Sequence, residues 1–95
     1  MNQYIFNDNG VLEVQQIRKY DLAFFYNRCP FAFRKEIENL FIMSFKKKFY
    51  TSNEVRKIFA HLGDVTRADV ENAQLRIKEY KRKLRMKYRN KILNK

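Results

Sequence analysis

The chain of 95 residues has little of what redox, metal or phosphate-loop chemistry requires: one cysteine, one histidine, two glycines, one proline and no tryptophan. A single cysteine, Cys29, cannot form an internal disulfide, which favours a reducing intracellular setting and a role as a small buried hydrophobic residue. One cysteine and one histidine cannot build a zinc centre. Two isolated glycines, Gly10 and Gly63, cannot form a glycine-rich phosphate loop. We therefore expect no metal and no cofactor.

The sequence also lacks a long apolar run. Its most apolar stretch, residues 22–33, is interrupted by Arg28 and Pro30 and is far shorter than the roughly 20 apolar residues that a membrane-spanning helix needs. Residues 1–9 have neither the basic start nor the apolar run of a signal peptide. These absences favour a soluble, cytoplasmic protein with no membrane partner. The small size and the lysine- and asparagine-rich composition suggest a viral or mobile-element source, and for a viral protein the compartment is the host cytoplasm.

No pattern for catalysis is evident. His61 has no serine, cysteine or carboxylate partner at the spacing of a known motif. Glu36 and Glu38 are two residues apart, so on a helix they point about 200° away from each other and cannot act as a paired acid and base. We expect a protein that is not an enzyme.

The fold class expected is mainly α (α+β), a single domain over residues 1–95 with an N-terminal β-hairpin followed by three to four helices. Asn9-Gly10 lies between two short β-favouring runs, which predicts a hairpin over residues 3–16. Asp21 is the expected cap of a short helix over residues 22–29. Pro30 suits the first position of the next helix, whose apolar spacing continues to about Lys48.

Two further helices are marked by their capping residues. Thr51 and Glu54 form the pattern of a capping box, which predicts a helix over residues 52–62 that ends at Gly63. Thr66 and Asp69 repeat the pattern in a weaker form. The last helix then has no breaker from residue 67 to about residue 93. Its length of about 40 Å exceeds the diameter of about 30–35 Å expected for a compact chain of this size, so its end should project or contact a partner.

Charge is strongly segregated along the chain. Residues 1–44, an aromatic-rich half that should supply the core, carry five basic and five acidic residues and are neutral. Residues 45–95 carry 16 basic and five acidic residues, which accounts for the whole net charge of +11. From Arg76 to the end there are ten basic residues, and Glu79 is the one acid. A field of one sign over this length indicates a polyanionic partner.

The last helix combines an apolar stripe with basic flanks. Val70, Ala73, Ile77, Tyr80, Leu84 and Tyr88 recur at three- and four-residue steps. Four interpretations compete: a core helix with a solvated face, a polyanion-binding helix, a coiled-coil dimer and a membrane-surface helix. A solvated face usually mixes both signs of charge, and a membrane helix would carry larger apolar residues than the two tyrosines. Nucleic acid is therefore the favoured partner.

The helices on either side of Gly63 also resemble a helix-turn-helix in their order, although an antiparallel pair that only buries a core has the same pattern. In that interpretation the start of the last helix reads bases, and the remaining cations contact phosphates. The candidate nucleic-acid-binding residues are Lys46, Lys47, Lys48, Arg67, Asn72, Arg76, Lys78, Arg82, Lys83, Arg85, Lys87 and Arg89.

The function expected is a small non-enzymatic nucleic-acid-binding protein, a helix-turn-helix-like regulator of transcription, with DNA favoured over RNA. The alternative is a protein-interaction module, a small inhibitor or adaptor that docks through its aromatic surface or places its basic helix on an acidic protein. A homodimer is also expected, because the distal apolar stripe around Leu84 and the edge of the hairpin both need to be covered.

Overall fold

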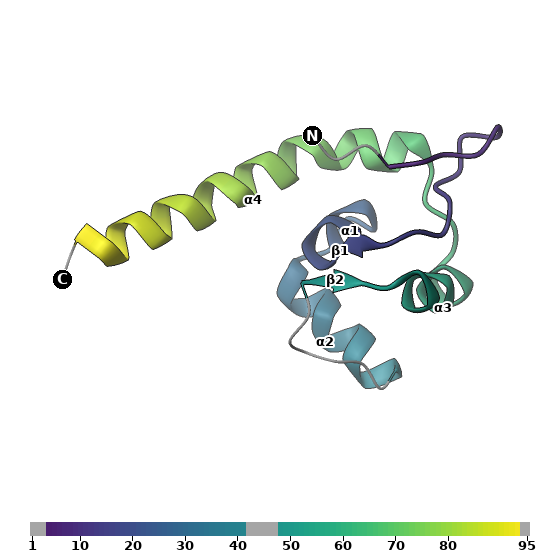
Figure 1. Cartoon of the computed structure of the whole chain (residues 1–95), viewed down its shortest axis with the longest axis horizontal. Helices are drawn as coiled ribbons and strands as arrows, with labels where there is room; N and C mark the ends of the chain where they lie inside the picture. The colour runs from purple at the N-terminus through teal and green to yellow at the C-terminus, as the bar shows by residue number, and fades with distance from the viewer. Residues whose placement is uncertain (1–3, 42–47, 94–95) are drawn as a thin grey trace.

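The computed structural model describes residues 4–41 and 48–93, with side chains as far as Lys87. The elements follow in this order: β1 (Ile17–Arg18), α1 (Lys19–Phe25), α2 (Pro30–Leu40), β2 (Phe49–Tyr50), α3 (Ser52–Leu62) and α4 (Arg67–Leu93). Figure 1 shows the described part as a small helical body from which α4 extends. The prediction of a mainly helical fold that begins with a hairpin and ends with a long helix is confirmed.

The N-terminal hairpin is short and lies against the start of α4. Phe6 and Leu12 form an antiparallel bridge, and Gly10 adopts a positive φ of 75° in the turn, a conformation that glycine accepts readily. Val11 then pairs with Thr66, and the Leu12 N–H donates to the Val65 carbonyl at 2.7 Å. The edge that was expected to need a second chain is therefore covered at this point by the chain itself.

The two-stranded sheet was not predicted. β1 and β2 are antiparallel, with Ile17 opposite Tyr50 and Arg18 opposite Phe49. The prediction that the second helix continues to Lys48 is wrong, because α2 ends at Leu40 and the next residue is extended. Lys48, which was expected in the last helical turn, instead directly precedes β2, and its carbonyl accepts a hydrogen bond from the Lys19 N–H at 3.0 Å.

Two expectations about the first helices are wrong. Asp21 does not cap α1, because the helix begins at Lys19 and places Asp21 inside it, where 1% of its surface is exposed. Cys29 is exposed and not buried, because it lies in the connection between α1 and α2. Pro30 does begin α2, as predicted.

The last two helices begin as their capping patterns predict. Thr51 and Glu54 form the reciprocal capping box of α3, and Gly63 ends that helix with a φ of 101°. The buried face of α4 consists of Val70, Ala73 and Ile77, which join a core to which every element of the body contributes. Because α4 has 27 residues, it is about 40 Å long, and it packs chiefly on α1 rather than on α3.

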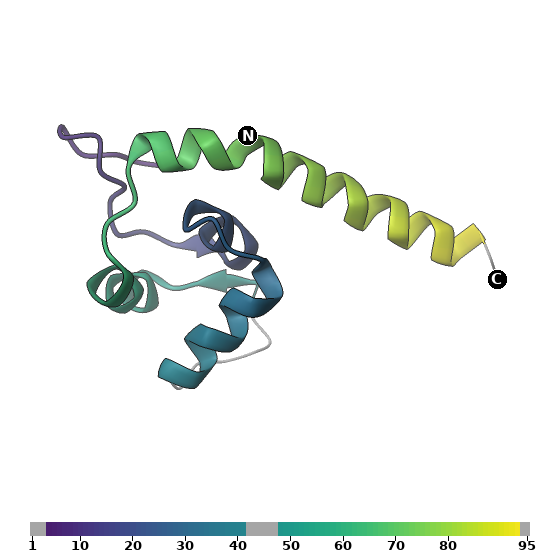
Figure 2. The same ribbon diagram turned by 180° about the vertical axis from the view of Figure 1, so that it is seen from behind.

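The far end of α4 extends away from the body. Figures 1 and 2 show the helix passing over α1 and continuing without a neighbour toward the C-terminus. The longest dimension of the molecule is 49 Å, against 29 and 18 Å for the other two. The predicted projection is therefore present, and along its described part it exposes basic residues such as Arg82 and Lys83 and, from the apolar stripe, Leu84.

Candidate nucleic-acid interface

The candidate interface is the part of α4 from Arg76 to Lys87. Ile77, 5% exposed, is its last buried residue, and Tyr80 and Lys81 are partly buried. From Arg82 to Lys87 every side chain is exposed, including Leu84 at 45% and Met86 at 54%. Residues 82–87 therefore contribute little to the core and are available for contact with another molecule.

The cations of this segment have no carboxylate partners within the described part of the chain. There are seven of them: Arg76, Lys78, Lys81, Arg82, Lys83, Arg85 and Lys87. Ion pairs are formed in the body, by Arg28 with Glu36 and by Arg34 with Glu38. Neighbouring like charges three or four residues apart on a helix repel one another, which a bound polyanion would relieve.

The exposed cations form two stripes along α4. Arg76, Lys83 and Lys87 fall within about 40° of one another around the helix axis, and we call them the aromatic stripe because they share their side of α4 with Tyr80. Lys78, Arg82 and Arg85 fall within about 60°, and we call them the cleft stripe. All six side chains are exposed. The two stripes are about 150° apart and so present positive charge on two sides of the helix.

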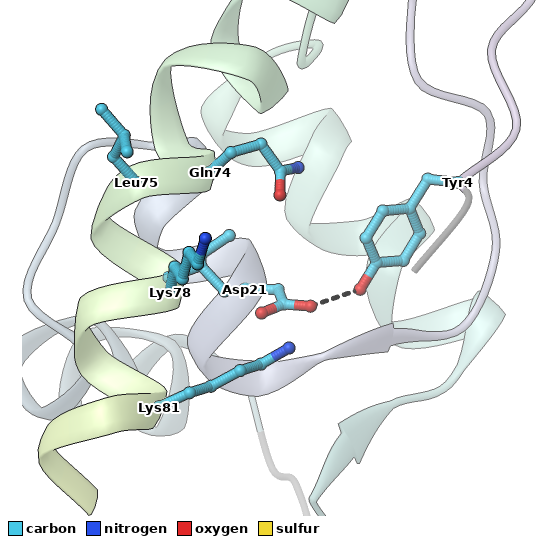
Figure 3. A pocket seen from close by; sticks show the side chains of 7 residues that line it. Tyr4, Asp21, Gln74, Leu75, Lys78 and Lys81 are labelled. Atoms are coloured by element: carbon cyan, nitrogen blue, oxygen red, sulfur yellow. Dashed lines mark hydrogen bonds between the residues drawn. The ribbon is translucent and has the colours of Figure 1, made fainter. Parts of the chain in front are cut away.

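A cleft of about 410 Å³ borders the cleft stripe (Figure 3). At its floor, the Tyr4 hydroxyl donates a hydrogen bond of 2.6 Å to the carboxylate of Asp21, which is the one buried charged residue of the described part. Burial, and then this hydrogen bond, raise the pKa of Tyr4 well above its usual range, so the hydroxyl stays protonated. Lys78 and Lys81 extend from α4 over the cleft. The bond fixes the N-terminal segment beneath α4.

An aromatic cluster lies on the other side of α4. The ring of Tyr80 is 5.2 Å from that of Tyr20 and 5.5 Å from that of Phe24, measured between ring centroids. The Arg18 guanidinium lies 5.3 Å above the Tyr20 ring and 5.1 Å from the Phe49 ring. All of these side chains are partly buried, so their outer surfaces are accessible. The sequence gives only a weak sign of this cluster, which is that Tyr20 and Phe24 share one face of α1 by their spacing.

The residues predicted to contact phosphates alone divide into three groups. The part of α4 from Arg76 to Lys87 is called distal α4 below. Five of the predicted residues are exposed on it: Lys78, Arg82, Lys83, Arg85 and Lys87. Lys46, Lys47 and the side chain of Arg89 lie outside the described residues. Lys48 is exposed, but it lies before β2 and belongs to neither stripe. Lys81, which the sequence analysis omitted, belongs to the same segment as the exposed cations.

The residues expected to read bases lie in two different surroundings, because the N-terminal hairpin contacts Arg67, whereas Asn72 and Arg76 face Phe24. The Arg67 guanidinium lies 4.5 Å from the Phe6 ring, and the backbone N–H of Arg67 donates to the Gly10 carbonyl at 2.8 Å, so Arg67 is held by the N-terminal segment. Asn72 and Arg76 are exposed on the side of α4 that faces Phe24. Asp69 closes the cap of α4, where its carboxylate accepts from the Thr66 N–H at 2.9 Å.

Neither a metal centre nor a membrane span is found in the described part of the chain. No cluster of three or more histidine, cysteine, aspartate or glutamate residues there could hold a metal ion. None of the described helices combines the length and the apolar character needed to cross a membrane. No family model, curated protein or solved structure matches the chain.

Proposed function

We propose that this protein is a small, non-enzymatic nucleic-acid-binding protein that holds the phosphate backbone with distal α4. The observation that carries the proposal is the pair of basic stripes on a helix segment that projects from the body and whose described cations have no acidic partners. Phosphates supply the missing negative charge, and counterions released from the nucleic acid add to the affinity.

The spacing of the stripes favours duplex DNA over RNA. An α-helix with its side chains is about 10–12 Å across, and the major groove of B-DNA is about 12 Å wide. A helix in that groove can direct the aromatic stripe to the phosphates of one strand and the cleft stripe to those of the other. The major groove of duplex RNA is too narrow and deep for such an approach.

A second candidate is docking on a protein, and a specific observation favours it. Leu75, Leu84 and Met86 are exposed on α4 at 76%, 45% and 54%. Phosphates would leave these apolar side chains uncovered, whereas a second copy of the chain or an acidic protein could cover them. Light scattering at micromolar concentration distinguishes a homodimer from a monomer of 11.7 kDa, and Leu84→Glu should convert a dimer formed through this face to monomer.

Charge reversal tests the leading proposal. Arg82→Glu, Lys83→Glu and Arg85→Glu, combined in one variant, should weaken binding to a 20-base-pair DNA duplex at least 100-fold in fluorescence anisotropy. The matched control reverses Lys35, Arg56 and Lys57, which are exposed on the body and lower the net charge by the same amount. Equal losses in the two variants would show that only net charge matters and would contradict the assignment to α4.

A further inference from the structure

A second cavity, of about 390 Å³, lies between the end of α1 and the first part of α4, and Arg76 is the residue of the aromatic stripe that lines it. It is lined by Phe24, Phe25, Asn27, Asp69, Asn72, Ala73 and Arg76. Its volume is within the range of about 300–1,000 Å³ that is typical of sites for small molecules. The phosphate contacts proposed above leave this cavity unused, although it directly adjoins the residues that would make them.

One wall of the cavity is aromatic and held in place. Phe24 is partly buried, lines the cavity and packs against Tyr80 at an interplanar angle of 66°. Tyr80 is in turn packed on Tyr20, so neighbours on both helices fix the ring of Phe24. A fixed aromatic surface beside a line of cations is the arrangement with which proteins stack the unpaired bases of single strands.

The other wall offers hydrogen-bonding groups that can pair with the edge of a base. Asn72 and Arg76 are exposed, and within the described part of the chain neither makes a hydrogen bond or an ion pair. An amide supplies both a donor and an acceptor, and a guanidinium supplies donors, which can pair with the edge of a base. The carboxylate of Asp69 would repel a phosphate that entered the cavity.

Resting on the proposed function, we infer that this cavity receives one unpaired base of a single-stranded segment. The backbone of that segment follows the aromatic stripe, because Arg76, which lines the cavity, and Lys83 are two turns apart on the same side of α4, about 10 Å along the axis. A base inside an intact duplex is stacked and paired, and α1 stands beside Asn72 and Arg76, so the cavity selects for opened or single-stranded DNA next to the bound duplex.

Three DNA probes test the inference by fluorescence anisotropy: a blunt duplex, the same duplex with a six-adenine overhang, and that duplex with an abasic overhang. The abasic overhang carries the same phosphates without bases. The adenine overhang should bind about 5- to 100-fold more tightly than the abasic one, as expected for a base stacked on an aromatic side chain. A fourth probe with a ribo-adenine overhang tests whether the unpaired base comes from DNA or RNA. The overhang that binds more tightly, deoxy or ribo, shows which of the two the cavity prefers.

Two variants and a matched control assign the effect to the cavity. Phe24→Leu, checked by its thermal melt, and Asn72→Ala, an exposed substitution that does not touch the core, should each abolish most of the preference for the adenine overhang. Arg85→Gln lies about 180° around the helix from Arg76 and should weaken binding to all three probes alike.

The outcomes separate the two proposals. If the adenine and abasic overhangs bind equally, or if Phe24→Leu and Asn72→Ala weaken all probes to the same degree, the cavity does not receive a base and the inference fails while the proposed function stands. If the wild-type protein binds none of the probes at low salt, the proposed function fails and the inference fails with it.

Discussion

In the body of the molecule, Arg28 and Arg34 pair with Glu36 and Glu38, whereas the described cations of α4 from Arg76 to Lys87 have no such partners. The apolar residues differ in the same way. Leu22 on α1 is fully buried, and Leu84 on α4 is 45% exposed. In the body, cations have carboxylate partners and apolar side chains are buried within the chain itself. In α4 from Arg76 to Lys87, the cations and the exposed apolar side chains both need another molecule to pair with or cover them.

The largest difference in the free energy of unfolding should come from replacing a leucine by alanine in each region in turn. Leu22→Ala removes a fully buried side chain and should lower the free energy of unfolding by about 2–5 kcal/mol. Leu84→Ala should change it by about 0.5 kcal/mol or less, because surface substitutions rarely do more. Urea unfolding followed by circular dichroism measures both. A cost at Leu84 close to that at Leu22 would show that distal α4 is covered in solution.

Tyr4→Phe should have the next largest effect. It removes the hydroxyl that donates to the buried Asp21 carboxylate, and leaving such a group without this donor costs about 1–3 kcal/mol. The same urea titration measures the loss. Phe6→Leu, a change in the same N-terminal segment that leaves this bond in place, is the comparison, and it should cost less. A stability unchanged by Tyr4→Phe would contradict the tether between the N-terminal segment and Asp21.

High pH should also weaken the body. Burial raises the pKa of Tyr50 to about 12, and burial followed by the Asp21 hydrogen bond raises that of Tyr4 above its usual range. Because these groups hold their protons longer in the folded state, their contribution to stability is complete below about pH 10 and is lost as the pH rises past it. Unfolding measured between pH 8 and pH 11 should show this decline, and Tyr4→Phe should make it shallower.

Removal of distal α4 should have the smallest effect on stability. Truncation after Tyr80 deletes the partly buried Lys81 and the exposed side chains of residues 82–87 together with the residues that follow them, so we expect the fragment 1–80 still to unfold cooperatively with nearly the same free energy. It should nevertheless lose binding to duplex DNA, because most of both stripes is gone. A fragment that no longer unfolds cooperatively would show that the distal segment is part of the core.

The features that could be predicted from the sequence are those set by residues close together in the chain. Thr51 with Glu54 defined the start of α3, Gly63 its end, and Asn9-Gly10 the hairpin turn. The pairing of β1 with β2 could not be predicted, because each strand has two residues and they are far apart in the chain. The apolar spacing predicted that α2 continues past Leu40, but α2 ends there and the chain later forms β2, whose pairing with β1 accompanies the burial of Tyr50.

Only part of the candidate site could be predicted, because the rest depends on contacts between residues far apart in the chain. The basic residues of α4 follow from composition and helical spacing alone. The burial of Asp21 depends on Tyr4, and the aromatic cluster depends on α4 lying over α1, so both required the tertiary structure. Cys29 was expected to be buried from its residue type, and it is exposed because of its place between two helices.

The most direct test of the account is the salt dependence of binding to a DNA duplex. If distal α4 neutralises about five to six phosphates, the logarithm of the binding constant should fall against the logarithm of the salt concentration with a slope near −5. Arg82→Gln, Lys83→Gln and Arg85→Gln together should make the slope shallower by about 2.7, since each lost contact removes about 0.9. A slope that stays the same in this variant would contradict the claim that the projecting helix binds the phosphates.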